Sequence, residues 1–417
     1  MNVELAFGQS GLTIEAPDDA VVVRPVSILG VERGEDLVRE SLRRPFSGPP
    51  LGSLVRPGDR VVVAFPDITR PMPNRTVLPP LLAELEAIGV PPRDIELIAA
   101  TGTHRPATED ELREFVGDAI VDRYTVRNHV STDGEHVSIG EVDGAEVLID
   151  PAYVRADVRI VTGFVEPHFF AGFSGGPKAV CPGLAALETI LEAHSPARIA
   201  SEHATWLEIE GNPVHDFVRA AAGLLPPTFS IDVVINDRGQ LVDVFAGALQ
   251  AAHRAACRHV RKTVVQRVPG RFDVVVSTNG GYPLDRNLYQ AVKGMAAAER
   301  VVDDGGAILV AAECRDGVPE EGDFGRILAD ASTPAELVDA TAPAQLDRWQ
   351  AQVLGRVLQR APVGIFAPGL SSDQARRAHL EPVEDFGRAV GEALAARGPE
   401  ARLCVLPFGP LTVADPA

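Results

Sequence analysis

The stretch RVVVAFPDITRPMPNR, residues 60–75, decides the fold class of this chain. A β-rich run, RVVVAF, passes directly into a polar loop, PDITRPMPNR. Five later segments repeat this change from a β-rich run to a polar or glycine-rich loop. They are DIELIAA (94–100), DVRIVTGF (157–164), FDVVVST (272–278), GAILVAA (306–312) and GIFAPG (364–369).

Helical patterns lie between these runs. The clearest are TVLPPLLAELEAIG (76–89), AALETILEAH (185–194) and NPVHDFVRAAAGLL (212–225). Strands that alternate with helices along a chain are typical of α/β proteins. The sequence therefore predicts an α/β fold of two domains with mostly parallel sheets.

The composition excludes several classes of partner. The chain has 417 residues, of which 45% are hydrophobic, and a formal net charge of −19. Such an acidic surface repels nucleic acid and anionic membranes, so neither is expected to bind. The N-terminus, MNVELAFGQSGLTIEAPDD, reads as an alternating strand and not as a signal peptide, and no stretch is long enough to span a bilayer.

The cysteines give information about the cellular compartment. There are four, scattered along the chain without a CxxC pair. This argues against a disulfide framework and against a thiolate zinc site. We therefore expect a cytoplasmic protein; the sequence carries no signal of its oligomeric state.

The connector KTVVQRVPGR (262–271) lies between a helical stretch and a new strand, and it marks the expected domain boundary. We predict an N-terminal domain at 1–265 and a C-terminal α/β domain at 266–403. The final CVLPFGPLTV is a candidate strand that returns to the first domain, which would join 404–417 to it.

Four loops with polar motifs follow strand ends. In open α/β sheets, ligands bind beyond the carboxyl ends of the strands. Three of the loops fall in the N-terminal domain and the fourth opens the second domain, so we expect an active site in the interdomain cleft. The loops are Asp67–Arg75, Thr101–Pro106, Glu166–Lys178 and Asn279–Lys293.

Three histidines are candidates for chemistry. His104, in TGTHRP, and His168, in EPHF, both follow strands directly and suit general acid/base catalysis, because neutral histidine titrates near working pH. The alternative for each is a structural role in its loop, and their equivalent positions favour function. His194 ends a predicted helix, where a cation is favourable. It has no HxxxH or HxH partner, so any further metal ligands must come from elsewhere in the fold or from a cofactor.

Lys178 lies in an apolar, glycine-rich stretch, EPHFFAGFSGGPKAVCPG (166–183). GFSGGPK is not a P-loop, because Pro177 removes a backbone donor and Ala179 offers no hydroxyl for magnesium. A lysine in apolar surroundings suits the role of a nucleophile or an attachment point. The alternative is a salt bridge with an acid in the cleft.

Asp67, Thr69 and Arg70 in PDITRP, followed by Arg75, indicate anion recognition, since an arginine fork suits a carboxylate or a phosphate. The alternative is a network of bonds that braces the loop.

Gln290 and Lys293 share a face of a predicted helix with Arg286. This face is either a binding surface after a strand end or ordinary solvated surface.

Together, five motifs resemble the nickel-pincer-dependent lactate racemase family. The resemblance spans most of the chain, and the motifs also agree with the family in order and spacing. They are DITRP (67–71), TGTHRP (101–106), PHFFAGFSGGPKAVCPG (167–183), AHSPAR (193–198) and GYPLDRNLYQAVKG (281–294).

The resemblance implies a covalently attached nickel cofactor. In this family a lysine forms a thioamide to a pyridinium mononucleotide derived from nicotinic acid. The mononucleotide binds nickel through a ring carbon and two sulfurs, and a histidine is the fourth ligand. Matched to this sequence, Lys178 is the attachment residue and His194 the nickel ligand. The other implied cofactor-binding residues are Asp67, Thr69, Gly175, Gly176 and Tyr289.

The resemblance also implies the reaction. His104 and His168 match the acid/base pair, and Arg70, Gln290 and Lys293 match substrate contacts. The expected activity is racemisation or epimerisation of a lactate-like 2-hydroxy acid by reversible hydride transfer through a 2-keto acid. Cofactor-biosynthesis proteins are the implied partners.

Two other functions stay open on the residues. One is a divalent-metal hydrolase or lyase that uses His104, His168 and His194. The other is a non-catalytic carrier of the nickel cofactor, which would not need the two acid/base histidines.

Overall fold

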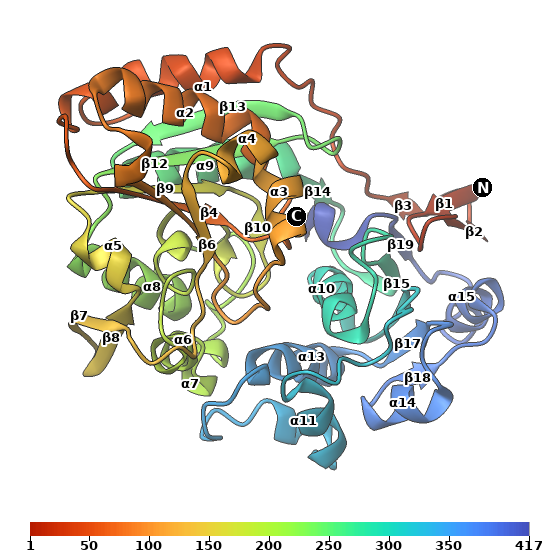
Figure 1. Cartoon of the computed structure of the whole chain (residues 1–417). Helices are drawn as coiled ribbons and strands as arrows, with labels where there is room; N and C mark the ends of the chain where they lie inside the picture. The colour runs from red at the N-terminus through yellow and green to blue at the C-terminus, as the bar shows by residue number, and fades with distance from the viewer. Residues whose placement is uncertain (417) are drawn as a thin grey trace. The chain divides into compact units, whose positions relative to one another are not determined.

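Strand β4 (Val61–Pro66) lies inside a six-stranded sheet in the computed structural model, which describes residues 1–416 (Figure 1). The other strands are β5 (Ile95–Ala100), β6 (Thr125–Asn128), β9 (Val158–Phe164), β12 (Phe229–Ile235) and β13 (Leu241–Gly247). Their order is β13-β12-β9-β4-β5-β6, and all neighbours are parallel except β13, which runs antiparallel to β12.

Helices cover both faces of this sheet. Val61, Val63 and Phe65 of β4 face one layer, while Val62 and Ala64 face the other. Because both faces are covered, the strand is apolar at every position. The first layer is α1 (Gly34–Arg43), α2 (Asn74–Ile88) and α3 (Glu109–Val116); the second includes α5 (Pro151–Arg155), α6 (Leu187–Ala193) and α8 (Pro213–Leu224). In Figure 1, α1 lies above the strands, and α6 and α8 lie below them.

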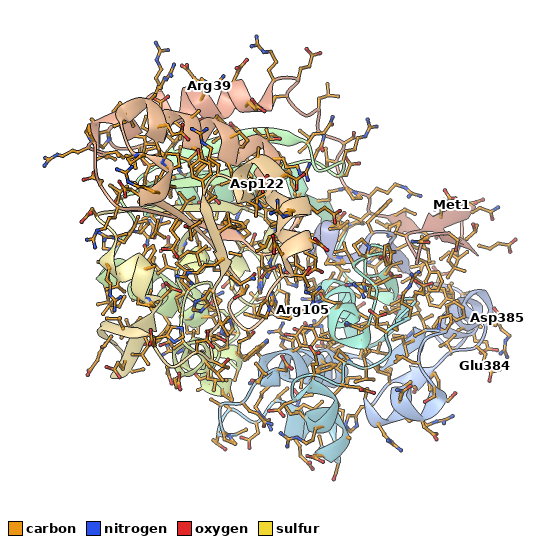
Figure 2. The ribbon with its side chains drawn as sticks, viewed as in Figure 1. Met1, Arg39, Arg105, Asp122, Glu384 and Asp385 are labelled. Carbon is orange, nitrogen blue, oxygen red and sulfur yellow. The ribbon has the colours of Figure 1, made fainter. Side chains whose placement is uncertain are left out.

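The outer sides of these helices carry the charge. In α1, Val38 and Leu42 are buried, whereas Arg39 lies on the outer side and pairs with Asp36 at 2.6 Å (Figure 2). The remaining elements of this part are one 16-residue helix with a buried face and several short elements. They are α4 (Asp118–Val121), α9 (Leu249–Val264), the hairpins β7 (Val137–Val142)/β8 (Ala145–Ile149) and β10 (Pro167–His168)/β11 (Gly172–Phe173), and the 3₁₀ turns Leu51–Ser53, Pro92–Asp94 and Gly176–Ala179.

A second six-stranded sheet is parallel throughout. In spatial order its strands are β18 (Glu381–Pro382), β17 (Val363–Phe366), β16 (Val302–Ala311), β15 (Phe272–Thr278), β19 (Leu403–Leu406) and β3 (Val21–Val22). Helices α10 (Leu288–Glu299) and α13 (Arg348–Arg360) pack on it. Helix α15 (Phe386–Ala395) and the hairpin β1 (Asn2–Leu5)/β2 (Leu12–Glu15) share a core with its strands.

The smaller elements here are α7 (Pro196–Ile199), α11 (Phe324–Asp330), α12 (Pro334–Leu337), α14 (Ser372–Arg377), the 3₁₀ turn Gly409–Leu411, and the pair β14 (Val265–Val268)/β20 (Val413–Pro416).

The chain forms two compact units, each with one of these sheets. We call them the central unit, Ser27–His194 with His203–Lys262, and the terminal unit, Met1–Val26 with Ser195–Glu202 and the chain from Thr263 onward.

Both ends of the chain differ from the sequence-based expectation. The strand at 403–406 pairs with β15 and β3, and residues 413–416 pair with β14, so the end of the chain does not return to the N-terminal domain. The first residues also belong with the terminal unit, because Val3, Leu5 and Ile14 are buried against its sheet and α15. The local sequence around a strand shows that one of its faces is apolar, but it does not show which distant segment will cover that face.

The predicted α/β class with mostly parallel sheets is confirmed. The helical patterns at 76–89, 185–194 and 212–225 correspond to α2, α6 and α8. None of the helices in residues 1–416 combines the length and apolar character needed to cross a membrane.

Asn212 caps α8 and also holds the neighbouring loop. Its Oδ1 accepts the backbone N–H groups of Val214 (3.1 Å) and His215 (3.2 Å). Its Nδ2 donates to the carbonyl oxygens of Phe170 (2.9 Å) and Glu208 (3.0 Å). The side chain is fully buried, and the bonds to Phe170, Val214 and His215 form away from water.

We expect Asn212→Ala to lower the free energy of unfolding by about 2 kcal/mol or more, because a lost cap costs up to about 2 kcal/mol and buried carbonyls also lose a donor. Asp385→Ala is the matched control. Asp385, labelled in Figure 2, is exposed and caps α15 by accepting the N–H of Arg388 at 2.9 Å, so about 1 kcal/mol is expected. Denaturant titration of both variants measures the difference. Equal losses would show that the bonds to Phe170 and Glu208 add no stability.

Candidate active site

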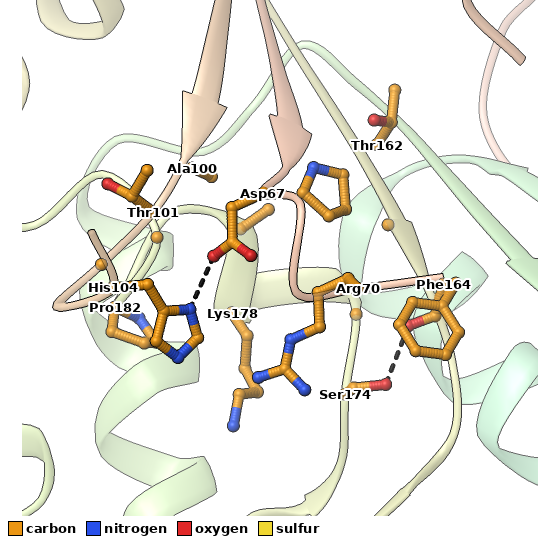
Figure 3. Close-up of a pocket in the computed structure, with 16 residues that line it drawn as sticks. Asp67, Arg70, Ala100, Thr101, His104, Thr162, Phe164, Ser174, Lys178 and Pro182 are labelled. Atoms are coloured by element: carbon orange, nitrogen blue, oxygen red, sulfur yellow. Dashed lines mark hydrogen bonds and ion pairs between the residues drawn. The ribbon is translucent and has the colours of Figure 1, made fainter. Parts of the chain in front are cut away.

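The loops after β4, β5 and β9 contribute to one pocket of the central unit (Figure 3). Strands β4 and β5 are paired in register up to Pro66 and Ala100, so their loops begin side by side. The empty space, including the open mouth, is about 580 Å³. The polar lining includes Asp67, Arg70, Thr101, His104, Ser174 and Lys178.

Asp67 and His104 form a hydrogen-bonded pair in this pocket. His104 Nδ1 lies 2.7 Å from Asp67 Oδ2, while Asp67 Oδ1 accepts the N–H (2.7 Å) and the hydroxyl (2.6 Å) of Thr69. Burial alone would raise the pKa of Asp67, but the His104 hydrogen bond, the charges of His104 and Arg70 and the Thr69 hydroxyl lower it overall. An ionised Asp67 accepts a proton-bearing Nδ1, so the neutral His104 ring carries its lone pair on Nε2.

Lys178 extends from a tight 3₁₀ turn, Gly176–Ala179. Gly175 and Gly176 have φ of +77° and +53°, a region that favours glycine. The Lys178 Nζ lies 5.5 Å from the centre of the Phe170 ring, a cation–π distance. In Figure 3 the side chains of His104, Lys178 and Arg70 extend in the same direction, away from the strand ends.

The Phe170 ring also contacts two of the predicted histidines. His168 packs edge-to-face against it at 4.5 Å between ring centres, and His194 does so at 5.4 Å. His168 is buried and stacks on Phe169 at 4.8 Å. Its Nδ1 accepts the backbone N–H of Ala171 at 3.3 Å, which places the proton of the neutral ring on Nε2.

His194 is a buried, neutral imidazole. Its Nδ1 donates to the carbonyl oxygen of Ile190 at 2.8 Å, so the lone pair lies on Nε2. Burial lowers its pKa to about 4, and the nearby Lys178 charge acts in the same direction. Within residues 1–416 no three His, Cys, Asp or Glu side chains are grouped to hold a metal ion. His104, His168 and His194 therefore do not form a ready-made three-histidine centre.

Arg70 and Arg75 have different positions. Arg70 lines the pocket, and its guanidinium lies 3.8 Å from the carboxylate of Glu166. Arg75 instead donates to the carbonyl oxygens of Glu114 (2.8 Å) and Arg113 (3.2 Å) near the end of α3. The interpretation of Arg75 as an anion contact is therefore wrong, because its guanidinium is used to cap a helix end.

The fourth motif lies on α10 in the terminal unit. Lys293 Nζ donates to Gln290 Oε1 at 2.7 Å, so these two predicted substrate contacts share one face of the helix. The hydroxyl of Tyr289 accepts from Trp349 Nε1 at 3.1 Å. The expectation that Arg286 shares this helix face is wrong, because Arg286 precedes the N-cap of α10, Asn287, and forms a surface ion pair with Asp316 at 2.8 Å.

Comparisons with known proteins identify the family. Two family models match the chain: the lactate racemase N-terminal domain over residues 7–206 and the lactate racemase C-terminal domain over residues 267–413. The chain belongs to the lactate racemase family. It is 35% identical to the lactate racemase of Lactiplantibacillus plantarum and 33% identical to that of Thermoanaerobacterium thermosaccharolyticum, in each case over 98% of both chains.

Solved structures agree with this assignment. The lactate racemase apoprotein from Thermoanaerobacterium thermosaccharolyticum superposes with a TM-score of 0.91 at 31% identity, covering 99% of this chain and all of the other. A Thermotoga maritima protein at 17% identity, with a TM-score of 0.70 over 94% of this chain and all of the other, shares the fold alone. Membership of the lactate racemase family confirms the resemblance seen in the sequence and the expectation of an isomerase.

Sequence reasoning missed two residues of the site. Phe170 contacts Lys178, His168 and His194, and Glu166 pairs with Arg70. The aromatic doublet directly after His168 was a signal for the first. Nothing in the sequence pairs Glu166 with a residue almost a hundred positions earlier.

Proposed function

We propose that this chain racemises or epimerises a small, lactate-like 2-hydroxy acid, with a nickel-pincer nucleotide attached covalently at Lys178. The observation that carries the proposal is that Lys178, Arg70 and the Asp67-supported His104 line one pocket. A covalent attachment point, a cation for a carboxylate and an oriented base are the groups that this chemistry needs.

The residues around Lys178 fit such a group. His194 is neutral with its lone pair on Nε2, the form of imidazole that binds metals, and both it and Lys178 contact the Phe170 ring. Lys178 would hold the group and His194 would supply a nitrogen ligand. Asp67, Thr69, Gly175, Gly176 and Tyr289 are the other proposed contacts. Bound there, the group supplies a reversible acceptor of hydride for the α-carbon of the substrate.

His104 is the proposed base for the substrate hydroxyl. Its Nε2 carries the lone pair, because Nδ1 faces the carboxylate of Asp67. When Nε2 takes the hydroxyl proton, the resulting imidazolium lies beside that carboxylate and is stabilised by it. The hydrogen bonds from Thr69 keep Asp67 in place as the charge develops.

His168 is the proposed partner of His104 for the opposite enantiomer. In this structure it starts in a different state, with Nδ1 accepting a backbone N–H and the ring proton on Nε2. It therefore meets a substrate oxygen first as a hydrogen-bond donor. To act as a base it must first exchange this tautomer, so the two histidines should not be equivalent.

The substrate carboxylate is assigned to cations on both units. Arg70 offers a guanidinium in the pocket, whose pairing with Glu166 at 3.8 Å is loose enough to be replaced by a substrate carboxylate. Lys293 and Gln290, on α10, are the other proposed contacts of the substrate.

The test is the intact mass and nickel content of the chain produced together with cofactor-biosynthesis proteins. We expect a covalent adduct that maps to Lys178, about one nickel per chain, and loss of optical purity in a screen of 2-hydroxy acids. An unmodified Lys178 without nickel, despite active cofactor synthesis, would overturn the proposal.

His194→Ala should separate attachment from metal binding. His194 would bind nickel without touching the lysine bond, so we expect the adduct at Lys178 to remain. The affinity of the adduct for nickel should fall about 10- to 100-fold. Mass spectrometry measures the adduct and metal analysis the nickel. Full nickel retention would remove His194 from the ligand set.

No observation favours the other functions. A hydrolase built on three histidines would need a cluster of metal-ligating side chains, and residues 1–416 contain no such cluster. A non-catalytic carrier would not need the Asp67–His104 pair, which is fully formed. The cytoplasmic location stays a prediction, supported by four buried cysteines that form no disulfide.

A further inference from the structure

Behind the Lys178 turn lies a buried polar pair that the proposed chemistry does not use. Asp232, on β12, accepts the backbone N–H of Gly176 through Oδ1 at 2.8 Å. His253, on α9, donates from Nε2 to the carbonyl oxygen of Ser174 at 3.0 Å. Both side chains are 1% exposed. They therefore hold the turn on either side of Gly175, just before Lys178.

The turn is shaped around these two side chains. A Cβ on Gly176 would lie 2.3 Å from Cγ of His253, and one on Gly175 would lie 2.8 Å from Oδ1 of Asp232. Gly163 faces Asp232 across the pairing of β9 and β12, and a Cβ there would lie 2.9 Å from the same oxygen. Two glycines thus leave space for the carboxyl group of Asp232, and a third leaves space for the ring of His253.

Asp232 has the surroundings of a neutral acid. Its Oδ2 is buried and has no hydrogen-bond partner within residues 1–416, and an ionised carboxylate in that position would be poorly compensated. Burial raises the pKa of Asp232, against smaller lowering effects of His253 and the Gly176 N–H. A neutral carboxyl group that accepts one N–H has nearly the shape and function of an asparagine amide.

We propose that Asp232 and His253 are positioning residues, which fix the Ser174–Gly176 turn so that Lys178 extends into the pocket. Neither touches the cofactor or the substrate; each acts through the backbone of the turn. The inference rests on the proposed function only for the bond that Lys178 is positioned to form. Because misplacing a reacting group by about 1 Å can cost about 10²-fold in rate, losing either bond should slow attachment by about that factor.

Four variants test this proposal: Asp232→Ala, Asp232→Asn, His253→Leu and Ser230→Ala. Ser230 is the matched control. It is buried two residues before Asp232 on the same face of β12, and its hydroxyl donates to Gly247 at 3.0 Å and not to the turn. Lys178, Lys262 and Lys293 are the only lysines in the chain, so an adduct is mapped without ambiguity.

The first readout uses the full chain produced with cofactor-biosynthesis proteins. It measures the rate of adduct formation at Lys178, and kcat and KM per attached cofactor. We expect Asp232→Ala and His253→Leu to form the adduct about 10²-fold more slowly, with a lower kcat. Asp232→Asn should rescue both, and Ser230→Ala should match the wild type.

Two results would overturn the proposal. If Asp232→Ala and His253→Leu only lower the yield of folded protein, with normal attachment and kcat per folded chain, the pair is merely structural. If Asp232→Asn loses as much as Asp232→Ala, a charge and not an acceptor is needed. Should Asp232→Ala fail to fold, His253→Leu decides, because it leaves no buried charge.

The second readout needs no cofactor. In the apoprotein, hydrogen exchange at the Gly176 amide and acylation of Lys178 relative to Lys262 report the state of the turn. We expect faster exchange and an altered labelling ratio in Asp232→Ala and His253→Leu, but not in Asp232→Asn. This result would support the positioning role even if the wild type takes up no adduct and the proposed function fails. Unchanged exchange and labelling would overturn it.

Discussion

Lys178→Arg is expected to abolish the covalent adduct and reduce racemisation to background, a loss of at least about 10⁶-fold, the lower end of enzymatic rate enhancements. Arginine preserves the charge and the packing on Phe170, which lies 5.5 Å from Nζ. Its guanidinium stays protonated, however, and cannot form the amide-type bond that a neutral lysine amine can. The measurement is intact mass together with the rate of loss of optical purity.

Lys262→Arg is the matched control, since Lys262 is an exposed lysine on α9. It should keep both the adduct and the activity. Racemisation by Lys178→Arg at a rate near that of the wild type would show that the reaction needs no group attached at this position.

Asp67→Asn is expected to lower kcat by about 10⁴-fold, the cost of holding a catalytic imidazole in the wrong tautomer. Thr69 directs two donors at Oδ1, at 2.7 and 2.6 Å, so the asparagine oxygen will occupy that position. Its NH₂ group then faces Nδ1 of His104 and donates to it. The His104 proton moves to Nε2, and the base loses its lone pair.

Asp150→Asn is a suitable control, because Asp150 also lies beside a histidine, His129 at 3.3 Å, but does not line the pocket. It should cost stability and leave kcat per attached cofactor near the wild-type value. If Asp67→Asn kept kcat within about tenfold, His104 would not act as a base through Asp67.

The same carboxylate gives a pH dependence of stability. The pKa of Asp67 in the folded chain lies below its ordinary value of 3.8. Its ionised form therefore stabilises the fold above pH 3.8, and this contribution is lost as the pH falls through the lower, folded pKa. The difference in unfolding free energy between wild type and Asp67→Asn should shrink over that acidic range, which denaturant titration at several pH values would measure.

Local sequence patterns predicted the elements that local chemistry determines. The runs at 60–65, 94–100 and 157–164 became neighbouring parallel strands, and parallel strands place their following loops at one edge. That rule brought Asp67, His104 and Lys178 into one pocket before any distance was known. Motifs quoted from the same loops also identified the family.

Contacts over long sequence separations were not predictable. In the sequence, Asp232 is an ordinary polar residue within a strand, FSIDVVI, and His253 is an ordinary histidine within an amphipathic helix. Their partners Gly176 and Ser174 lie 56 and 79 positions away, and only tertiary packing brings them together. The prediction for Arg75 was wrong for a related reason, because its guanidinium binds the end of a helix 38 residues later in the sequence.

Within residues 1–416, strand β3 pairs only with β19, and the two strands are far apart in the sequence. A ribosome that adds about 5–20 residues per second takes roughly 20–80 s to synthesise the intervening segment. Throughout that time β3 has no partner, although the hairpin β1/β2 can form locally. The central unit, which is complete at Lys262, can fold first. The segment that contains β3 must therefore remain unaggregated until β19 has been synthesised, and an acidic chain with a net charge of −19 is well suited to that delay.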